Sequence, residues 1–166
     1  MAEYWDIYDV NRNKTGELHE RGKELKNGQY HLVVGIWVKN KNNEILLTQR
    51  SKEKVWNGYW ECTGGAVVAG EDSITGAKRE LFEEIGVEAS QESLKFLGTT
   101  FYKSWFTDTY LLEKDIKLSD LKLQKEEVRD AKWVSISEFD SMCTKGMIVP
   151  IILEQFKYYR NVILES

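Results

Sequence analysis

Runs of β-branched and aromatic residues predict most of the strands in this chain. The segment 30–39 (Y-H-L-V-V-G-I-W-V-K) is one such run, and the segment 44–50 (E-I-L-L-T-Q-R) follows it after a polar N-K-N-N turn. We therefore expect these two segments to form a β-hairpin. A turn with the sequence N-R-N-K-T-G separates two shorter strands near the N-terminus. The strands predicted besides the hairpin are residues 5–10, 18–20, 61–68, 94–103, 106–113 and 131–134.

The hydrophobic period becomes helical from residue 73 onward. One face of the predicted helix carries Ile74, Ala77, Leu81 and Ile85. Asp72 or Ser73 can cap its start, and Gly86 suits the left-handed position after its end. S-I-S-E resembles a capping box that opens a helix over residues 135–143, and residues 150–163 favour a last amphipathic helix. These elements predict an α+β fold, with a largely β core and a few helices packed on it.

Length and composition are typical of a single globular domain. The chain has 166 residues, of which 42% are hydrophobic, and it contains no repeat or Pro/Ser-rich linker. We expect one domain over residues 1–166, with a short N-terminal β-hairpin and a C-terminal helix. The sequence shows neither a secretory signal nor an uncharged apolar span of about eighteen residues. We therefore expect a soluble, cytoplasmic protein.

Charge and cysteine content exclude several classes of protein. Cys62 and Cys143 are too few for a disulfide framework or a zinc site, which fits a reducing compartment. The net charge is −4 and no stripe of Lys or Arg is present, so nucleic acid and an anionic membrane are not expected as the main partner. An anionic ligand would need a cation as mediator.

Three glutamates share one wall of the predicted helix beside its apolar face. Glu80, Glu83 and Glu84 lie three and four residues apart, where each exposed like-charged pair costs about a few tenths of a kcal/mol. The repulsion grows as the local dielectric falls near a core. A divalent cation would reverse its sign, and carboxylate oxygens suit Mg²⁺, Mn²⁺ or Ca²⁺ better than zinc. For E-x-x-E-E alone, a solvated acidic face is the alternative.

The residues around these glutamates match a longer pattern. The segment from Gly65 to Val87 is G-A-V-V-A-G-E-D-S-I-T-G-A-K-R-E-L-F-E-E-I-G-V. It resembles the signature of the Nudix hydrolases, G-x5-E-x7-R-E-U-x-E-E-x-G-U, where U is a bulky aliphatic residue. Every fixed position of that signature is matched, by Gly65, Glu71, Arg79, Glu80, Leu81, Glu83, Glu84, Gly86 and Val87.

This resemblance implies a fold, a cofactor and an activity. Nudix hydrolases form an α/β/α sandwich around a mixed β-sheet, bind Mg²⁺ or Mn²⁺, and hydrolyse a diphosphate linked to some moiety X. By motif position, Glu83 and Glu84 are implied as the principal metal ligands, and the main-chain carbonyl of Gly65 as a neighbour of the metal. Glu80 is implied as a further ligand or as the general base, and it is our first choice of base. The ion would neutralise the diphosphate and activate a bound water.

The same resemblance implies supporting roles for neighbouring residues. Arg79 would brace one of the carboxylates, and Glu71 would hydrogen-bond or coordinate from the loop. The family draws its general base either from the helix or from a carboxylate elsewhere. Asp108 in F-T-D-T-Y and the pair Glu126 and Glu127 are the candidates outside the signature. A role in solubility at a strand edge or loop is the alternative for each.

A second resemblance covers most of the first half of the chain. Y-H-L-V-V-G-I-W-V-K-N, I-L-L-T-Q-R-S and W-N-G-Y-W are similar to segments of the isopentenyl diphosphate isomerases, which share the Nudix fold. Those enzymes use a catalytic cysteine and a His-rich metal site, but here Gly64 and Gly65 occupy the corresponding region. Cys62 lies nearer the preceding tryptophan than that cysteine should, and His31 has only His19 as a second histidine. We expect His31 to be a strand residue with satisfied hydrogen bonds, and an isomerase is the runner-up.

The identity of X is not encoded in any spacing that we recognise. Trp60 and Trp105 are candidate substrate contacts, because aromatic side chains stack on bases, although packing in the core or at the rim explains them as well. Tyr102 is a further candidate, because some Nudix enzymes that act on dinucleoside polyphosphates carry a tyrosine near this position; packing of a strand tyrosine on the sheet is its alternative. The expected partner is a small-molecule diphosphate, a nucleotide derivative. A homodimer is a further expectation, since dimers are common in the family. A catalytically silent nucleotide sensor is another alternative, although such domains usually lack some of the signature carboxylates.

Overall fold

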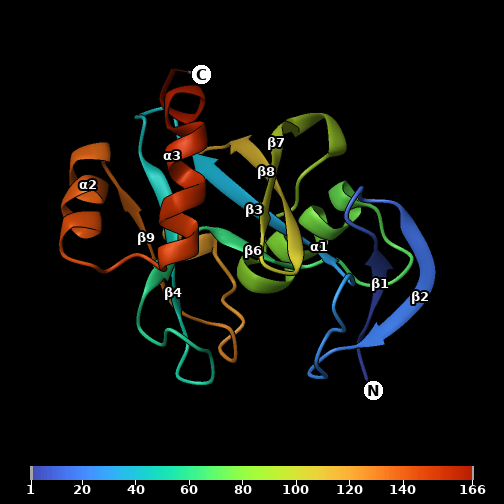
Figure 1. Cartoon of the computed structure of the whole chain (residues 1–166). Helices are drawn as coiled ribbons and strands as arrows, with labels where there is room; N and C mark the ends of the chain where they lie inside the picture. The colour runs from blue at the N-terminus through green and yellow to red at the C-terminus, as the bar shows by residue number, and fades with distance from the viewer. Residues whose placement is uncertain (1, 166) are drawn as a thin grey trace.

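The computed structural model describes residues 2–165, which form a mixed β-sheet flanked by helices (Figure 1). The strands are β1 (Tyr4–Tyr8), β2 (Lys14–Glu20), β3 (His31–Lys39), β4 (Ile45–Arg50), β5 (Trp60–Glu61), β6 (Thr63–Ala66), β7 (Leu94–Tyr102), β8 (Trp105–Glu113) and β9 (Val128–Val134). The helices are α1 (Ser73–Ile85), α2 (Ile136–Thr144) and α3 (Pro150–Glu165). Short 3₁₀ turns occupy Gln91–Ser93 and Leu118–Asp120.

The main sheet has the strand order β5-β4-β3-β8-β7, with β6 also paired to β3 and β9 to β4. At its centre β3 and β8 run parallel, with Val34 opposite Asp108, and the other pairs are antiparallel. The predicted hairpin of β3 and β4 is confirmed, with Val38 opposite Leu46. The N-terminal hairpin is also confirmed, because β1 and β2 form a two-stranded sheet of their own.

Alternate residues of the central strands face two different cores. Val34 and Ile36 of β3 pack with Leu81 and the rest of the apolar face of α1. Trp37, on the opposite side of β3, packs with Phe156 of α3 and with residues of α2. Figure 1 shows α3 crossing one side of the sheet, while α1 lies against the other. The expected α/β/α sandwich around a mixed sheet is therefore confirmed.

Helix α1 has the predicted bounds because its signals are local. Asp72 accepts a hydrogen bond from the Thr75 amide at 2.9 Å, as an N-cap does. Gly86 has a φ of 72° and donates to the carbonyls of the last turn. Leu81 and Ile85 are fully buried against the sheet. Burial of this apolar face fixes the direction in which the neighbouring glutamates project.

The strand predicted over residues 61–68 is wrong in one respect, because it is two short strands. Glu61 in β5 pairs with Thr48 of β4, whereas Thr63 in β6 pairs with Ile36 of β3. The chain therefore changes partner at Cys62. Two further strands begin several residues earlier than predicted, β2 at residue 14 and β9 at residue 128.

The predicted capping box of α2 is half present. Ser135 accepts from the Glu138 amide at 3.2 Å, but the Glu138 carboxylate pairs with Lys132 instead of returning to Ser135.

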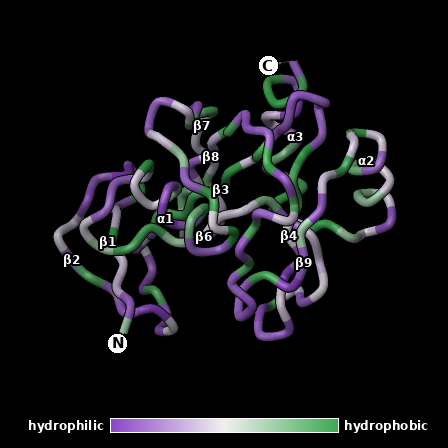
Figure 2. The backbone as a smooth tube through the Cα atoms, turned by 180° about the vertical axis from the view of Figure 1, so that it is seen from behind, coloured by the Kyte–Doolittle hydropathy of each residue, from purple (hydrophilic) through white to green (hydrophobic). Residues whose placement is uncertain are grey.

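Figure 2 shows hydrophobic segments concentrated in the interior, with hydrophilic residues along much of β2 and the outer loops. Within residues 2–165, no helix combines the length and apolar character that a membrane span requires.

Candidate active site

Arg79 organises the carboxylates that α1 presents. Its Nη1 donates to Glu80 Oε1 at 2.8 Å and to Glu83 Oε2 at 3.0 Å. Its Nε and Nη2 donate to the two oxygens of Glu71 at 2.9 and 3.0 Å, and Nη2 also reaches the carbonyl of Ala66 at 2.9 Å. Burial alone would lower the pKa of Arg79, but its bonds to Glu71 and Glu80 outweigh burial and raise it. Arg79 thus holds three carboxylates, and Glu71 holds Arg79 from the loop before the helix.

Glu84 is the buried member of the carboxylate wall, which we define as Glu80, Glu83 and Glu84. It is 4% exposed, and its Oε2 accepts from the Gly64 amide at 3.3 Å. Lys54 Nζ lies 3.6 Å from Glu84 Oε1 and 2.5 Å from Glu127 Oε2. Burial raises the pKa of Glu84 to about 8, with Lys54 opposing that rise. Lys54 therefore ties the wall to Glu127, one of the carboxylates expected outside the helix.

Gly65 allows the Glu80 carboxylate to lie directly against the main chain of β6. A Cβ atom at this position would come within 2.5 Å of Glu80 Oε1, so a larger residue would displace the carboxylate. Burial raises the pKa of Glu80, and Arg79 opposes it. The side-chain donors gathered here are three carboxylates, all of them oxygen, and Gly65 lines the same small cavity. Such a donor set fits Mg²⁺ or Mn²⁺ rather than a metal that prefers nitrogen or sulfur.

The wall is held by cations of the chain itself. Across residues 2–165, no group of three or more His, Cys, Asp or Glu side chains has the spacing of a formed metal cage. Instead, Arg79 lies between Glu80 and Glu83, and Lys54 lies beside Glu84. Binding a divalent cation would therefore require these carboxylates to turn from Arg79 and Lys54 toward the ion.

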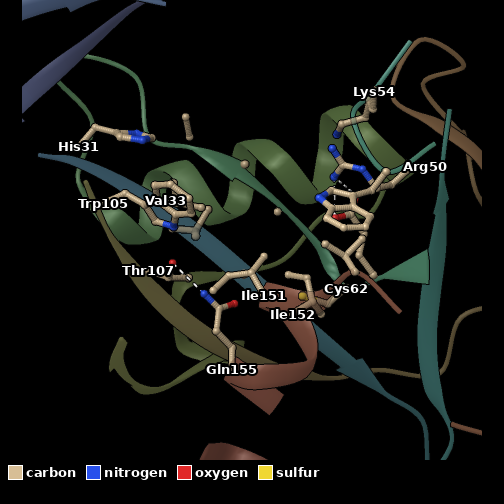
Figure 3. Close-up of a pocket in the computed structure, with 18 residues that line it drawn as sticks. His31, Val33, Arg50, Lys54, Cys62, Trp105, Thr107, Ile151, Ile152 and Gln155 are labelled. Atoms are coloured by element: carbon tan, nitrogen blue, oxygen red, sulfur yellow. Dashed lines mark hydrogen bonds and ion pairs between the residues drawn. The ribbon is translucent and has the colours of Figure 1, made fainter. Parts of the chain in front are cut away.

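Two cavities meet beside the wall. A small polar cavity of about 130 Å³ is lined by the wall, Arg79 and Glu127. A larger cavity of about 330 Å³ lies under the N-terminal end of α3 (Figure 3). The residues that line both are Lys54, Gly64, Gly65 and Ala66. A ligand could therefore have one part against the carboxylates and another in the larger cavity.

The larger cavity changes character along its length. Arg50, Lys54 and Glu61 lie at one end, where Arg50 Nη1 is 2.7 Å from both oxygens of Glu61 (Figure 3). Much of the remaining lining is apolar, and it includes Val33, Cys62, Val149, Ile151 and Ile152. At the other end Thr107 and Gln155 form a buried hydrogen-bonded pair. A cavity that is mostly apolar with a few placed polar groups is typical of small-molecule sites.

Comparison with known proteins decides the family. The NUDIX domain model matches residues 29–151, and the complete signature lies within that range. The chain belongs to the Nudix hydrolase family. It is 35% identical over 150 residues to an uncharacterized Nudix hydrolase of Listeria monocytogenes, and the match covers 89% of each chain. Nudix hydrolases generally use divalent metals.

This Nudix hydrolase is also similar to an isomerase in sequence and to solved Nudix structures in fold. It is 29% identical over 119 residues to an isopentenyl-diphosphate Delta-isomerase of Pectobacterium atrosepticum, covering 70% of this chain and 60% of the isomerase. A Deinococcus radiodurans protein has the same fold at 20% identity, with a TM-score of 0.74 and coverage of 89% and 92%. The NUDIX domain of Shewanella oneidensis NrtR, solved with ADP ribose, has a TM-score of 0.66 at 20% identity, covering 81% of this chain and 88% of that one.

The three aromatic residues expected to contact substrate are in different environments. Trp105 lines the larger cavity of the Nudix hydrolase. Trp60 is 7% exposed, lies in the core between the sheet and α2, and has Lys132 Nζ 4.9 Å from its ring centre. Tyr102 is 40% exposed and lines a separate groove between β7 and α3. The locations of Trp60 and Tyr102 thus argue against the substrate contacts expected of them.

Asp108 lines neither of the two cavities beside the carboxylate wall, so it is not placed to act as the base. Side chains alternate along β8, so Thr107 faces the cavity while Asp108 faces the opposite core. Asp108 is buried there in an ion pair with Arg12, and it accepts from Thr99 Oγ1 at 2.7 Å. These contacts give it a structural role, and the expectation of a catalytic role is corrected.

His31 is also different from expectation. It lines the larger cavity and stacks on Trp5, with ring centroids 4.2 Å apart, but its buried Nδ1 has no hydrogen-bond partner among residues 2–165. Burial lowers the pKa of His31 to about 4, so the ring is neutral at pH 7. The expectation that its hydrogen bonds are satisfied is therefore wrong. Cys62 is a buried thiol with a raised pKa in the same cavity.

Several residues of the site were not predicted from sequence. Lys54 was missed although it stands among the charges of R-S-K-E-K, a cluster that could have flagged it. Gln155 was missed although it is a polar residue next to Phe156 on the buried face of α3. Arg50 and Glu61 carried no comparable signal, because their pairing depends on the antiparallel register of β4 and β5.

Proposed function

We propose that this Nudix hydrolase cleaves the pyrophosphate bond, an acid anhydride, of a nucleoside diphosphate linked to a further group X, by attack of water at phosphorus. One observation carries this proposal. The carboxylate wall adjoins a larger and mostly apolar cavity, and Lys54 lies at their junction. Such a site suits a substrate with a highly charged diphosphate on one side and an uncharged group on the other.

The proposed cofactor is Mg²⁺ or Mn²⁺. Glu83, Glu84 and the carbonyl of Gly65 would hold it, with Glu80 as a further ligand or as the general base, since these residues line the small polar cavity and offer oxygen donors. When bound, a divalent cation neutralises diphosphate charge and lowers the pKa of a coordinated water.

The chain's own residues would supply the other roles. Glu80 is the proposed general base, and Arg79 positions it together with Glu83 and Glu71. Glu127 is the alternative base, because Lys54 holds its carboxylate at the edge of the same cavity. Lys54 would also contact a phosphate oxygen once the ligand enters, since its ammonium group lies between the two cavities.

The uncharged part of the substrate would lie against Trp105. Support for a nucleotide derivative comes from the fold relative that was solved with ADP ribose. We also propose a single domain over residues 1–166, a cytoplasmic location and a homodimer. The continuous main sheet supports the first, the two free thiols fit a reducing compartment, and the family supports the third.

An isomerase acting on isopentenyl diphosphate is the second candidate. It is supported by the similarity to isopentenyl-diphosphate isomerases and by Cys62, which lines the larger cavity. Against it, burial raises the pKa of the Cys62 thiol, and glycines stand where the isomerase cysteine and histidine are expected.

The test is a panel of diphosphates incubated with and without Mg²⁺. It contains nucleoside triphosphates, dinucleoside polyphosphates, nucleotide sugars, NADH, ADP-ribose and isopentenyl diphosphate. We expect Mg²⁺-dependent release of a nucleotide product that is lost in Glu83→Gln and kept in Glu88→Gln, an exposed glutamate just beyond α1. Allylic product without hydrolysis would favour the isomerase. Binding without any turnover would favour a catalytically silent sensor.

A further inference from the structure

The inner end of the larger cavity carries a polar pair that the chemistry at the carboxylate wall does not use. Gln155 of α3 is 6% exposed, and its Nε2 donates to Thr107 Oγ1 of β8 at 3.0 Å. Thr107 is the hydrogen-bond partner described for this carboxamide within residues 2–165, which leaves the carbonyl oxygen and a second N–H. Gln155 lines the cavity, and its carboxamide is not among the buried polar groups without a partner in residues 2–165, so these two groups are open to a ligand in the cavity.

The surroundings of the pair select for an uncharged ligand group. Ile151 and Val33 line the cavity beside Gln155 and Thr107, while the charged residues Arg50 and Lys54 lie at the far end of the cavity (Figure 3). A charged group at the inner end would lose its hydration without gaining a counter-ion. The ligand group at this end is therefore neutral, and it carries both a donor and an acceptor for the carboxamide.

Trp105 adds a requirement for shape. Its indole lines the same end of the cavity as Thr107, and Figure 3 shows the two near each other. A flat ring can stack on an indole while its edge bonds to an amide. An aliphatic chain would leave Gln155 unsatisfied, and a sugar would bury hydroxyl groups against isoleucine and valine.

We propose that the inner end of this cavity binds a nucleobase and that Gln155, held in place by Thr107, is the residue that selects the base. A carboxamide offers a donor and an acceptor side by side, which matches the edge of a nucleobase. This assignment rests on the proposed function in one respect, that the substrate is a nucleotide derivative.

Gln155 also separates the cavity from a neighbouring groove. Ile151 and Gln155 line both the cavity and a groove of about 690 Å³, whereas Glu154 and Tyr158 line the groove alone. Glu154→Gln is thus a matched control, because it changes the adjacent residue of α3 without touching the cavity.

The test measures binding of AMP, GMP, CMP and UMP to the full chain by calorimetry in Mg²⁺, since these monophosphates contain no pyrophosphate bond to cleave. We expect the wild type to prefer one base. Gln155→Leu, which keeps the bulk of the side chain, should lower the affinity for the preferred monophosphate by about tenfold and reduce the difference in affinity among the four bases. Thr107→Val should act in the same direction with a smaller loss, and Glu154→Gln should match the wild type. Melting curves check that each variant is folded.

Three results would overturn the proposal. The first is that the wild type binds all four monophosphates equally, or binds none of them. The second is that both Gln155→Leu and Thr107→Val keep the wild-type affinity and base preference. The third is that isopentenyl monophosphate competes for the site as strongly as the preferred nucleotide does. The proposed function fails separately. If Mg²⁺-dependent hydrolysis is found and Glu83→Gln abolishes it, but Gln155 has no effect on base preference, only the base-selection proposal fails. If Gln155 selects the base but no substrate is hydrolysed, only the proposed function fails.

Discussion

The carboxylate wall and the larger cavity meet at Lys54, yet they are built in opposite ways. The wall comes from one continuous stretch, in which a loop, a helix and their spacing bring Glu80, Glu83 and Glu84 together with Arg79. The cavity is assembled from β3, β8, the loop after β4 and the start of α3. The wall is therefore a local structure, whereas the cavity exists only once distant segments have packed.

The two regions also solve different electrostatic problems. Carboxylates and cations crowd the wall, where Arg79 and Lys54 balance buried negative charge. The cavity keeps charge at one end, and at the other it holds neutral groups such as His31 and Gln155. A metal-dependent reaction at a diphosphate needs the first kind of surface, and recognition of an uncharged group needs the second. Variants on either side should therefore have separable effects.

The largest effect is expected at the wall, from Glu84→Gln. Loss of this proposed metal ligand should lower kcat on the order of a thousandfold, because a bound cation contributes several kcal/mol to the transition state. The melting temperature should not fall, since burial raises the pKa of Glu84 to about 8 and a neutral amide is easier to bury than a carboxylate. Steady-state kinetics and calorimetry measure both quantities. If Glu84→Gln were as active as the control Glu88→Gln, Glu84 would have no role in the reaction.

The next effect concerns His31, at the uncharged end of the larger cavity, and it is a dependence of stability on pH. The pKa of His31 is about 4 in the fold, against 6.5 as its ordinary value, so the unfolded chain binds the proton more readily. Stability contributed by this residue is present above pH 6.5 and is lost as the pH falls from 6.5 to 4, by up to about 3 kcal/mol. Urea denaturation should show a smaller loss in His31→Phe, which keeps a flat ring but cannot titrate. Parallel pH curves for the two proteins would refute a depressed pKa.

Trp105 and Trp60 offer a sharper comparison within one residue type. Trp105→Ala should raise KM by about tenfold with little change in stability, because stacking on a flat ligand is worth about 1–3 kcal/mol. Trp60→Ala should instead lower the free energy of unfolding by about 3 kcal/mol, because Trp60 is 7% exposed in a packed core. Kinetics and chemical denaturation distinguish the two. The comparison fails if Trp60→Phe, a milder change, raises KM as much as Trp105→Ala does.

The smallest effect is expected from Tyr102→Phe. Tyr102 lines the groove on the far side of Gln155, outside the larger cavity. Removal of its hydroxyl group should therefore leave kcat/KM unchanged for every substrate. Measurement on the whole diphosphate panel checks this. A selective loss with longer substrates would show that the groove takes part in binding.

Prediction from sequence succeeded where the signals are local. The bounds of α1 follow from the Asp72 cap, the apolar spacing and Gly86, all within fifteen residues. The carboxylate wall follows from the same helix, because residues three and four apart share a face. Arg79 was expected to brace one carboxylate, and its guanidinium in fact contacts three.

Prediction failed where long-range pairing decides the outcome. Whether Thr107 or Asp108 faces the cavity depends on which face of β8 is turned toward α3, and a shift of one residue would exchange them. Gln155 meets Thr107 from 48 positions away, so no spacing in the sequence signals their contact. The break between β5 and β6 likewise depends on two different partner strands. The cavity was therefore beyond prediction, although most of its strands were foreseen.

The most direct test of the central claim is to locate the metal. Crystals of the wild type grown with Mn²⁺ would be measured at a wavelength where manganese scatters anomalously, and Glu83→Gln crystals would be treated identically. The account predicts an anomalous peak beside Glu80, Glu83, Glu84 and the Gly65 carbonyl, weakened or absent in the variant. A peak elsewhere, or none at the wall while hydrolysis still requires a divalent cation, would contradict it.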